Sequence, residues 1–291
     1  MTSLSKFPIY LRPPQSFRVA HTYYLRTDVK KAMCGYATSS RSYGIREGAF
    51  FNQKKKAFYR YIETENGKKP VNLTAEGISE ALRIGANAFY CSYWIYDSMD
   101  FTKPVGRDLV WVVRVKNGDL EFTKKVTKTV VEALSEAGAE PLVKYSGDLG
   151  FDIVIPLEAI PFEIWQGDLK ALDDLQSELS EAIVGNIRSR FCVAVEGKRH
   201  TFIVKEGEKT SLLSELRVKR GLLLAPMSLN PETGLVSVPV DPAELDSFTI
   251  LDASPSRVSA MMWGPGFPNY GLMRYAKVPQ AVIAEKSATG E

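Results

Sequence analysis

The residues best suited to binding chemistry form a basic and aromatic cluster between positions 54 and 61. Three consecutive lysines precede an arginine that has a tyrosine on either side. Basic side chains neutralise backbone phosphates and aromatic rings stack on bases, so such a cluster can hold a nucleic acid. The alternative is a solvated turn whose neighbouring aromatic side chains lie in the core. The basic members of this candidate site are Lys54, Lys55, Lys56 and Arg60.

Cysteine and histidine offer little further chemistry. Cys34, Cys91 and Cys192 are too widely spaced for a paired zinc motif, and an odd number of cysteines favours reduced thiols. The only histidines, His21 and His200, are far apart, which argues against a histidine-based hydrolase. We therefore predict no metal site and no cofactor.

Composition places few further limits on function. The chain has 291 residues, of which 45% are hydrophobic and 24% charged, as in ordinary soluble globular proteins. A net charge of +3 is too small to indicate a nucleic-acid binder by itself. There is no apolar signal core at the start and no apolar run of membrane-spanning length. We expect an intracellular, cytoplasmic protein without a membrane partner.

The central part of the chain predicts a strand, a helix and a hairpin. Residues 109–115 form a continuous apolar run broken by one arginine, which is typical of a buried strand. Apolar residues then recur at three and four positions over 119–136, which predicts an amphipathic helix. Two short strands, 142–145 and 151–156, flank a turn at 146–150. This order is typical of a domain that combines helices with a sheet.

We expect the whole chain to form one domain at 1–250 and a tail at 251–291. Within the domain we expect an N-terminal unit at about 25–95 and a core at about 105–250. Aromatic and methionine side chains stand without period among the glycines and prolines of the tail, which could pack on the core or on a partner. Further predicted elements are a hairpin of 49–51 with 57–62, helices at 74–84 and 169–187, a hairpin of 191–195 with 201–205 around the turn 196–199, and a last strand at 235–240.

Three motifs follow one another: Asp-Leu-Val-Trp-Val-Val-Arg, Ser-Gly-Asp-Leu-Gly-Phe-Asp, and Leu-Ala-Pro-Met-Ser-Leu-Asn with a later Thr-Gly-Leu. In this order they resemble motifs of the small, catalytic subunit of archaeal and eukaryotic DNA primase. The family strand Asp-Leu-Val-Phe-Asp-Ile-Asp corresponds to Asp-Leu-Val-Trp-Val-Val-Arg at 108–114. The family motif Ser-Gly-x-x-Gly-x-His corresponds to Ser-Gly-Asp-Leu-Gly-Phe-Asp at 146–152. The third, Arg-x-Pro-x-Ser-Leu-His followed by Thr-Gly-Leu, corresponds to Leu-Ala-Pro-Met-Ser-Leu-Asn at 224–230 and Thr-Gly-Leu at 233–235. Weaker matches stand at 46–50 and 88–92.

This resemblance implies an α+β, archaeo-eukaryotic primase-like fold, with an RRM-like mixed or antiparallel sheet core flanked by helices. In the family, the two strand carboxylates hold divalent ions for two-metal phosphoryl transfer. The corresponding residues here are Val112, which offers no ligand, and Arg114, which would repel a metal ion. Both lie on one face of the strand, because side chains alternate. The resemblance therefore implies no catalytic residue and no metal ligand.

The other two motifs lose charged contacts and keep turn residues. Asp152 and Asn230 stand where the family has histidines, whereas Ser146 and Gly147 remain as a remnant of a nucleotide-binding turn. If the two strands are neighbours, as the resemblance implies, Arg114 and Asp152 face each other. We predict a charge-assisted ion pair between them, since either charge would otherwise be buried alone.

We expect a catalytically inactive primase small-subunit-like protein that acts as an accessory or regulatory partner of primase subunits or other replication proteins. One alternative is a nucleic-acid or nucleotide-binding protein that acts alone. Another is an active DNA primase or nucleotidyltransferase with relocated acids, which would need Mg²⁺ or Mn²⁺. The acids available are Asp108, Asp119, Asp148 and Asp152. By strand rise, Asp108 lies about 13 Å from position 112, too far for one ion site.

Overall fold

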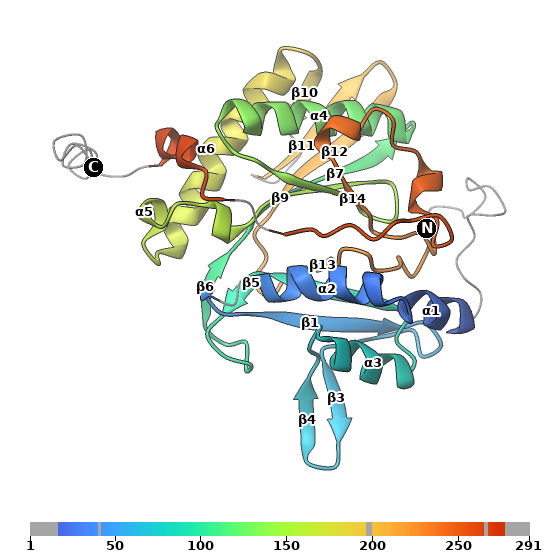
Figure 1. The fold of residues 1–291 in the computed structure, drawn as a ribbon. Coiled ribbons are helices and arrows are strands. Elements are labelled where there is room, and N and C mark those ends of the chain that lie inside the picture. Colours follow the sequence, from blue (N-terminus) through green and yellow to red (C-terminus); the bar gives the residue numbers. More distant parts are fainter. Residues whose placement is uncertain (1–16, 40–41, 196–199, 265–266, 277–291) are drawn as a thin grey trace.

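Two large antiparallel sheets with helices packed against them form the body of the protein, and a small two-stranded sheet stands apart from them (Figure 1). The computed structural model describes residues 17–39, 42–195, 200–264 and 267–276. The predicted turn at 196–199, the last part of the expected tail at 277–291 and the first part of the expected domain at 1–16 lie outside the described residues.

The first sheet has the strand order β13-β5-β1-β2, and β6 also pairs with β5. β13 comes from the range expected for the core, so the chain returns to this sheet after building most of the second. Neighbouring strands of this sheet run antiparallel. Its strands are β1 (Ile45–Asn52), β2 (Ala57–Tyr59), β5 (Ala88–Tyr96), β6 (Pro104–Arg107) and β13 (Leu222–Leu224).

The second sheet has the order β10-β11-β12-β7-β9-β8-β14, again with antiparallel pairs. β7 contains the strand predicted at 109–115 and lies in the middle of the sheet, and the predicted hairpin forms β8 and β9. The strands are β7 (Leu109–Asn117), β8 (Leu142–Tyr145), β9 (Gly150–Ile155), β10 (Cys192–Val195), β11 (Thr201–Glu206), β12 (Lys209–Leu216) and β14 (Pro239–Val240).

The helices predicted at 74–84, 119–136 and 169–187 are confirmed as α3, α4 and α6, whereas α1, α2 and α5 were not predicted. Helix α4 begins where the Asp119 carboxylate caps it by accepting a hydrogen bond from the Phe122 N–H at 2.9 Å. Trp111 of β7 donates its indole N–H to Ser180 of α6 at 2.8 Å, so one face of the second sheet packs against the helices above it. The helices are α1 (Phe17–Tyr24), α2 (Thr27–Ser39), α3 (Ala75–Arg83), α4 (Leu120–Glu136), α5 (Phe162–Trp165) and α6 (Leu169–Arg188).

Two strand predictions were wrong in extent. The strand expected at 57–62 divides at Arg60, and its second part, β3 (Tyr61–Thr64), pairs with β4 (Gly67–Pro70) in a separate hairpin that projects from the body (Figure 1). The last predicted strand, 235–240, is a strand only at β14. Short 3₁₀ helices follow other loops: η4 (Leu157–Ala159), η5 (Pro242–Glu244), η6 (Ile250–Ala253) and η7 (Tyr270–Tyr275).

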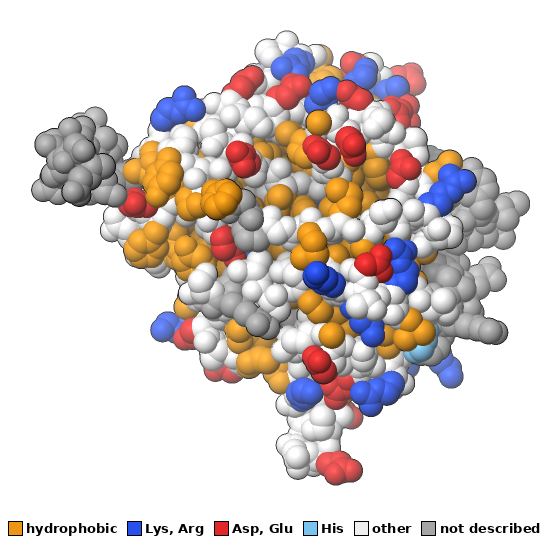
Figure 2. Space-filling model, viewed as in Figure 1, with side chains coloured by type: hydrophobic (Ala, Val, Ile, Leu, Met, Phe, Trp, Pro, Cys, Tyr) orange, Lys and Arg blue, Asp and Glu red, His pale blue; other side chains and the backbone are white. Residues whose placement is uncertain are grey.

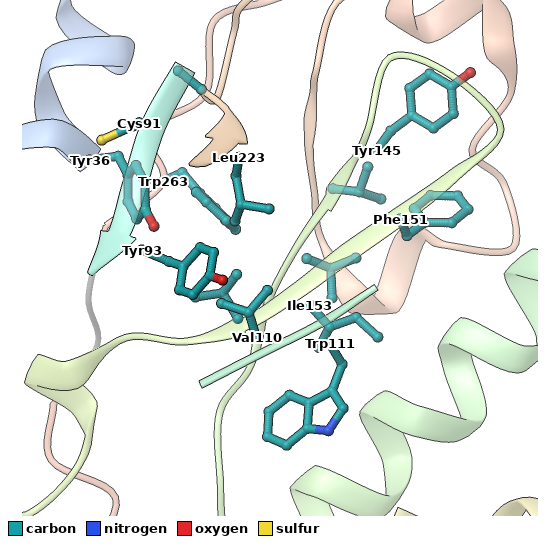
Figure 3. Close-up of a cluster of buried hydrophobic side chains, with 14 of the residues drawn as sticks. Tyr36, Cys91, Tyr93, Val110, Trp111, Tyr145, Phe151, Ile153, Leu223 and Trp263 are labelled. Atoms are coloured by element: carbon teal, nitrogen blue, oxygen red, sulfur yellow. The ribbon is translucent and has the colours of Figure 1, made fainter. Parts of the chain in front are cut away.

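Apolar side chains from both sheets meet in the interior (Figure 3). Trp263, from the segment expected to be a tail, is 3% exposed, and its ring centroid lies 5.0 Å from that of Tyr36 on α2. Figure 3 shows it beside Leu223 of β13, in the space between β5 and β7. This part of the chain therefore belongs to the core. Among the described residues, no helix is both long and apolar enough to cross a membrane.

Candidate functional site

The resemblance to primase places the metal site at Val112 and Arg114 of β7. Val112 lies in a row of paired residues that crosses the second sheet. Val112 of β7 pairs with Asp152 of β9 on one side and with Ser214 of β12 on the other. Asp152 in turn pairs with Lys144 of β8. Directly opposed residues of antiparallel strands point to the same face. Val112, Asp152 and Lys144 therefore share the face on which metal ligands would have to stand.

An ion network occupies this face. Nη2 of Arg114 binds one carboxylate oxygen of Asp152, and Nζ of Lys144 binds the other. The predicted ion pair between Arg114 and Asp152 is thus confirmed. Lys144 also donates to Oγ of Ser237 at 2.9 Å, and Nη1 of Arg114 donates to the carbonyl of Phe151 at 2.6 Å. One acid therefore holds two cations where the resemblance places metal ions.

The centre of the network is buried. The Lys144 side chain is 0% exposed and that of Asp152 is 2% exposed, whereas that of Arg114 is 32% exposed. Burial alone would raise the pKa of Asp152, but the charges of Arg114 and Lys144 outweigh it and lower that pKa to about 2. Burial lowers the pKa of Lys144, and the Asp152 carboxylate opposes that shift.

Trp263 covers the inner end of the network. Nζ of Lys144 lies 5.8 Å from the centroid of the Trp263 ring, within the range of a cation–π contact. Lys144 therefore meets a carboxylate, a hydroxyl and an aromatic face. These contacts compensate for much of its lost hydration and leave it inaccessible to a ligand.

The acids that could have relocated a metal site are dispersed. Asp108 accepts hydrogen bonds from both terminal nitrogens of Arg46, at 2.7 and 2.9 Å, and from the Tyr36 hydroxyl at 2.8 Å. Asp119 caps α4 and pairs with Lys209 at 3.1 Å. Within the described ranges, no three His, Cys, Asp or Glu side chains are grouped so that they could hold a metal ion.

Asp148, the fourth acid, lies in the turn of the second motif. Burial and the charge of Glu232 raise the pKa of its carboxyl, while Arg114 acts in the opposite direction. It thus lies near the exposed end of the ion network, but Asp152 is already bound there by Arg114. Asp148 thus has one acidic neighbour, Glu232, but among the described residues no group of three His, Cys, Asp or Glu side chains forms around them that could hold a metal ion.

The second and third motifs meet at a tight backbone contact. Gly147 has φ of +75°, and a Cβ added to it would lie 2.8 Å from Cβ of Asn230, so only glycine fits. The side-chain oxygen of Asn230 accepts hydrogen bonds from the N–H groups of Glu232 and Thr233, at 2.9 and 3.2 Å. Ser146 accepts from the N–H of Asp148 at 3.4 Å. Each of these side chains stabilises a turn in this structure.

The basic cluster is only partly assembled. Lys54, Lys55 and Lys56 are exposed in the turn between β1 and β2. Arg60 instead binds the fully buried Glu47 carboxylate, with 2.6 Å between its Nη1 and Oε2. Tyr59 turns to the other side of the sheet and stacks on Phe50, with 5.1 Å between ring centroids. Basic and acidic side chains are intermixed on the face shown in Figure 2, which presents no extended basic surface.

Several residues of the Asp152 network and of the Arg60–Glu47 cluster were not predicted from the sequence. Lys144 carried a usable signal, since it is the one charged residue of a short apolar strand beside the Asp152 strand. Glu47 carried a similar signal in β1. Arg220, which also binds Glu47, could not be found from the sequence because 173 residues separate the two.

Comparisons with known proteins support the fold. No protein-family model matches the chain, and no curated protein sequence matches it. The solved structures do contain a similar chain, described as the polymerase domain from Mycobacterium tuberculosis ligase D in complex with DNA. The TM-score is 0.54 and the identity 14%, and the match covers 89% of this chain and 88% of the other. The primase-polymerase type of α+β fold predicted from the motifs is thereby confirmed.

Proposed function

We propose that this chain is a catalytically inactive protein of the primase-polymerase fold that serves as an accessory or regulatory partner in DNA replication. The observation that carries the proposal is the buried network of Lys144, Asp152 and Arg114. Two-metal phosphoryl transfer needs hard anionic oxygens around the ions. Here the one available carboxylate is neutralised by two cations of the chain itself.

The retained features support a role in binding. The turns of the second and third motifs persist as backbone structures, while the ligands that gave them chemistry in the family are absent. A fold that keeps its shape without its metal ligands can still dock on the subunits beside which it works. The partners that we propose are primase subunits or other replication proteins.

Catalysis is tested with the full chain, a primed and an unprimed single-stranded template, nucleotides, and Mg²⁺ or Mn²⁺. We expect no template-directed incorporation and no Mn²⁺ binding detectable by electron paramagnetic resonance. Incorporation that disappears in Asp148→Asn would overturn the proposal and favour relocated acids, which makes that variant the informative control.

The accessory role is tested by cross-linking the tagged protein in its native cells and identifying what is attached. Recovery of primase subunits or other replication proteins at defined surface positions supports it. Recovery of nucleic acid alone contradicts it and favours the second candidate, a nucleic-acid binder that acts without replication partners. The observation that favours this candidate is the exposed turn with Lys54, Lys55 and Lys56. The similar polymerase domain of ligase D is in complex with DNA, which also supports it.

A further inference from the structure

The two faces of the first sheet carry different side chains. On one face, Phe89 of β5 contacts Tyr24 of α1, with 5.0 Å between ring centroids, and Gly48 of β1 lies against Leu73 before α3. Phe58 of β2 and Tyr90 of β5 point to the opposite face, where their ring centroids are 5.0 Å apart. Phe58 is 44% exposed there. A large aromatic ring is therefore partly exposed on this side of the sheet, beside the fully buried Ala49 and Ala88.

Two arginines stand beside this ring and are held in place by one buried acid. Glu47 is 0% exposed; Arg60 binds its Oε2, and Arg220 binds it with Nε, at 3.2 Å from Oε2, and with Nη2. Nη2 of Arg60 also donates to the carbonyl of Arg220 at 3.0 Å, and the Arg60 guanidinium lies 5.8 Å from the Phe58 centroid. The three exposed groups are contiguous.

The arginines retain donors for a ligand. A guanidinium carries five N–H donors, and the bonds to Glu47 and to the Arg220 carbonyl occupy only some of them. The side chains of Arg60 and Arg220 are 29% and 42% exposed. One acid and two cations leave a net charge of +1, fixed in position, so little side-chain entropy is lost when an anion binds. Arg220 has φ of +57°, a costly backbone conformation that this placement requires.

We propose that the exposed surface formed by Phe58, Arg60 and Arg220 binds single-stranded nucleic acid, with Phe58 stacking on a base and the two arginines contacting phosphates. The proposal goes beyond the accessory role, which concerns protein partners, and would add a nucleic-acid contact to it. Exposed aromatics on a sheet beside basic groups suit unstacked bases, because every base has a π-face that the interior of a duplex hides. The exposed Lys219 adds positive charge next to Arg220, while Glu232, whose charge together with burial raises the pKa of Tyr90 to about 12, limits the surface on the other side.

The test uses fluorescence anisotropy with a labelled oligothymidylate of about 15 nucleotides and a duplex of equal length, from about 50 to 200 mM NaCl. Arg60→Gln and Arg220→Gln are each expected to lower the slope of log K against log salt by about 0.7. Phe58→Ala is expected to weaken binding about tenfold without changing the slope. Each single arginine variant keeps one partner for Glu47, so either serves if the other fails to fold.

Arg188→Gln is the matched control, because Arg188 is exposed near the end of α6, away from the first sheet, and its loss removes the same charge. The proposed binding surface is contradicted by any of three results. These are an equal change of slope in this variant, tighter binding of the duplex than of the single strand, and undiminished binding by Phe58→Ala. Template-directed synthesis by the wild-type chain would overturn the proposed function and leave this surface standing. Failure of oligonucleotide binding without such synthesis removes the surface and leaves the accessory role.

Discussion

Two clusters of this protein share one composition and differ in their depth. On the second sheet, Asp152 holds Arg114 and Lys144, and on the first sheet, Glu47 holds Arg60 and Arg220. Each consists of one buried acid with two cations. In the Asp152 cluster one cation, Lys144, is completely buried, whereas in the Glu47 cluster both arginines reach solvent.

The difference shows that depth decides what an ion cluster can do. A buried lysine with a carboxylate, a hydroxyl and an aromatic ring has its hydrogen-bonding capacity used within the protein, so it contributes to structure. An exposed guanidinium on a buried acid keeps donors free and oriented. The buried Lys144 therefore ties the second-sheet network to the core, whereas both cations of the first-sheet cluster reach solvent and can meet an anion.

The largest expected effect follows from removing the acid of the buried cluster. Asp152→Asn leaves Lys144 buried without a counter-charge, which we expect to lower the free energy of unfolding by about 3–5 kcal/mol. Urea unfolding followed by circular dichroism measures it. Asp246→Asn is the control, because its partner Lys128 is 42% exposed and Asp246 is 67% exposed, and no resolved change is expected there. A loss of similar size in both variants would contradict the distinction by depth.

Acid should remove the same stabilisation. The pKa of Asp152 is about 2 in the folded chain, below its ordinary value of 3.8, so its contribution is present above about pH 4 and is lost as pH falls towards 2. The shift corresponds to roughly 2 kcal/mol. Urea unfolding at a series of pH values measures it, and Asp152→Asn should lack this component. An identical pH dependence in the two proteins would remove the assigned cause.

Removing the acid of the exposed cluster should cost less. Glu47→Gln leaves two arginines that water can reach, so we expect a loss of about 1–2 kcal/mol in the free energy of unfolding. The same urea experiment compares it directly with Asp152→Asn. The comparison between the clusters fails if Glu47→Gln proves the more damaging of the two.

The smallest effect is expected at the lysine turn. Lys55→Gln removes a charge carried on a flexible, exposed stem, 6.0 Å from the Tyr59 ring. Its effect on the salt slope of oligonucleotide binding should be smaller than that of Arg60→Gln, because the lysine is not fixed by a buried acid. Anisotropy titrations of the two variants in parallel decide this, and an equal or larger effect at Lys55 would place the phosphate contacts in the turn.

The sequence was informative where one periodicity or motif order decided the structure. The long helices α4 and α6 followed their apolar repeats, whereas α1, α2 and α5 were not predicted. The pair between Arg114 and Asp152 followed from strand alternation once the two strands were taken as neighbours. The region 235–240 was mispredicted because its backbone groups bond to loops: the N–H of Val236 donates to Ala253 and that of Ser237 to Ser228, at 2.8 and 2.7 Å. Such partners leave no local signal.

Contacts distant in sequence could not be predicted. Arg220 reaches Glu47 only because β13 returns to the first sheet beside β5. Lys144 is attached to Asp152 across a hairpin, but its third contact, Ser237, is 93 residues away. The resemblance predicted the fold and the loss of the two metal-binding acids. It could not predict Lys144, which lies at the position of the metal site because of packing that no short motif encodes.

The position of Trp263 also has a consequence for how the protein is made. The chain emerges from the ribosome from its N-terminus, so Tyr36 and Lys144 appear long before the residue that covers them. Val258, close to Trp263 in sequence, accepts a hydrogen bond from Nη1 of Arg26 at 3.1 Å, which joins the beginning of the described chain to its last part. Closure of the two layers therefore waits until residue 263 has been made and has left the ribosome. During that interval the newly made inner surface is available to a chaperone.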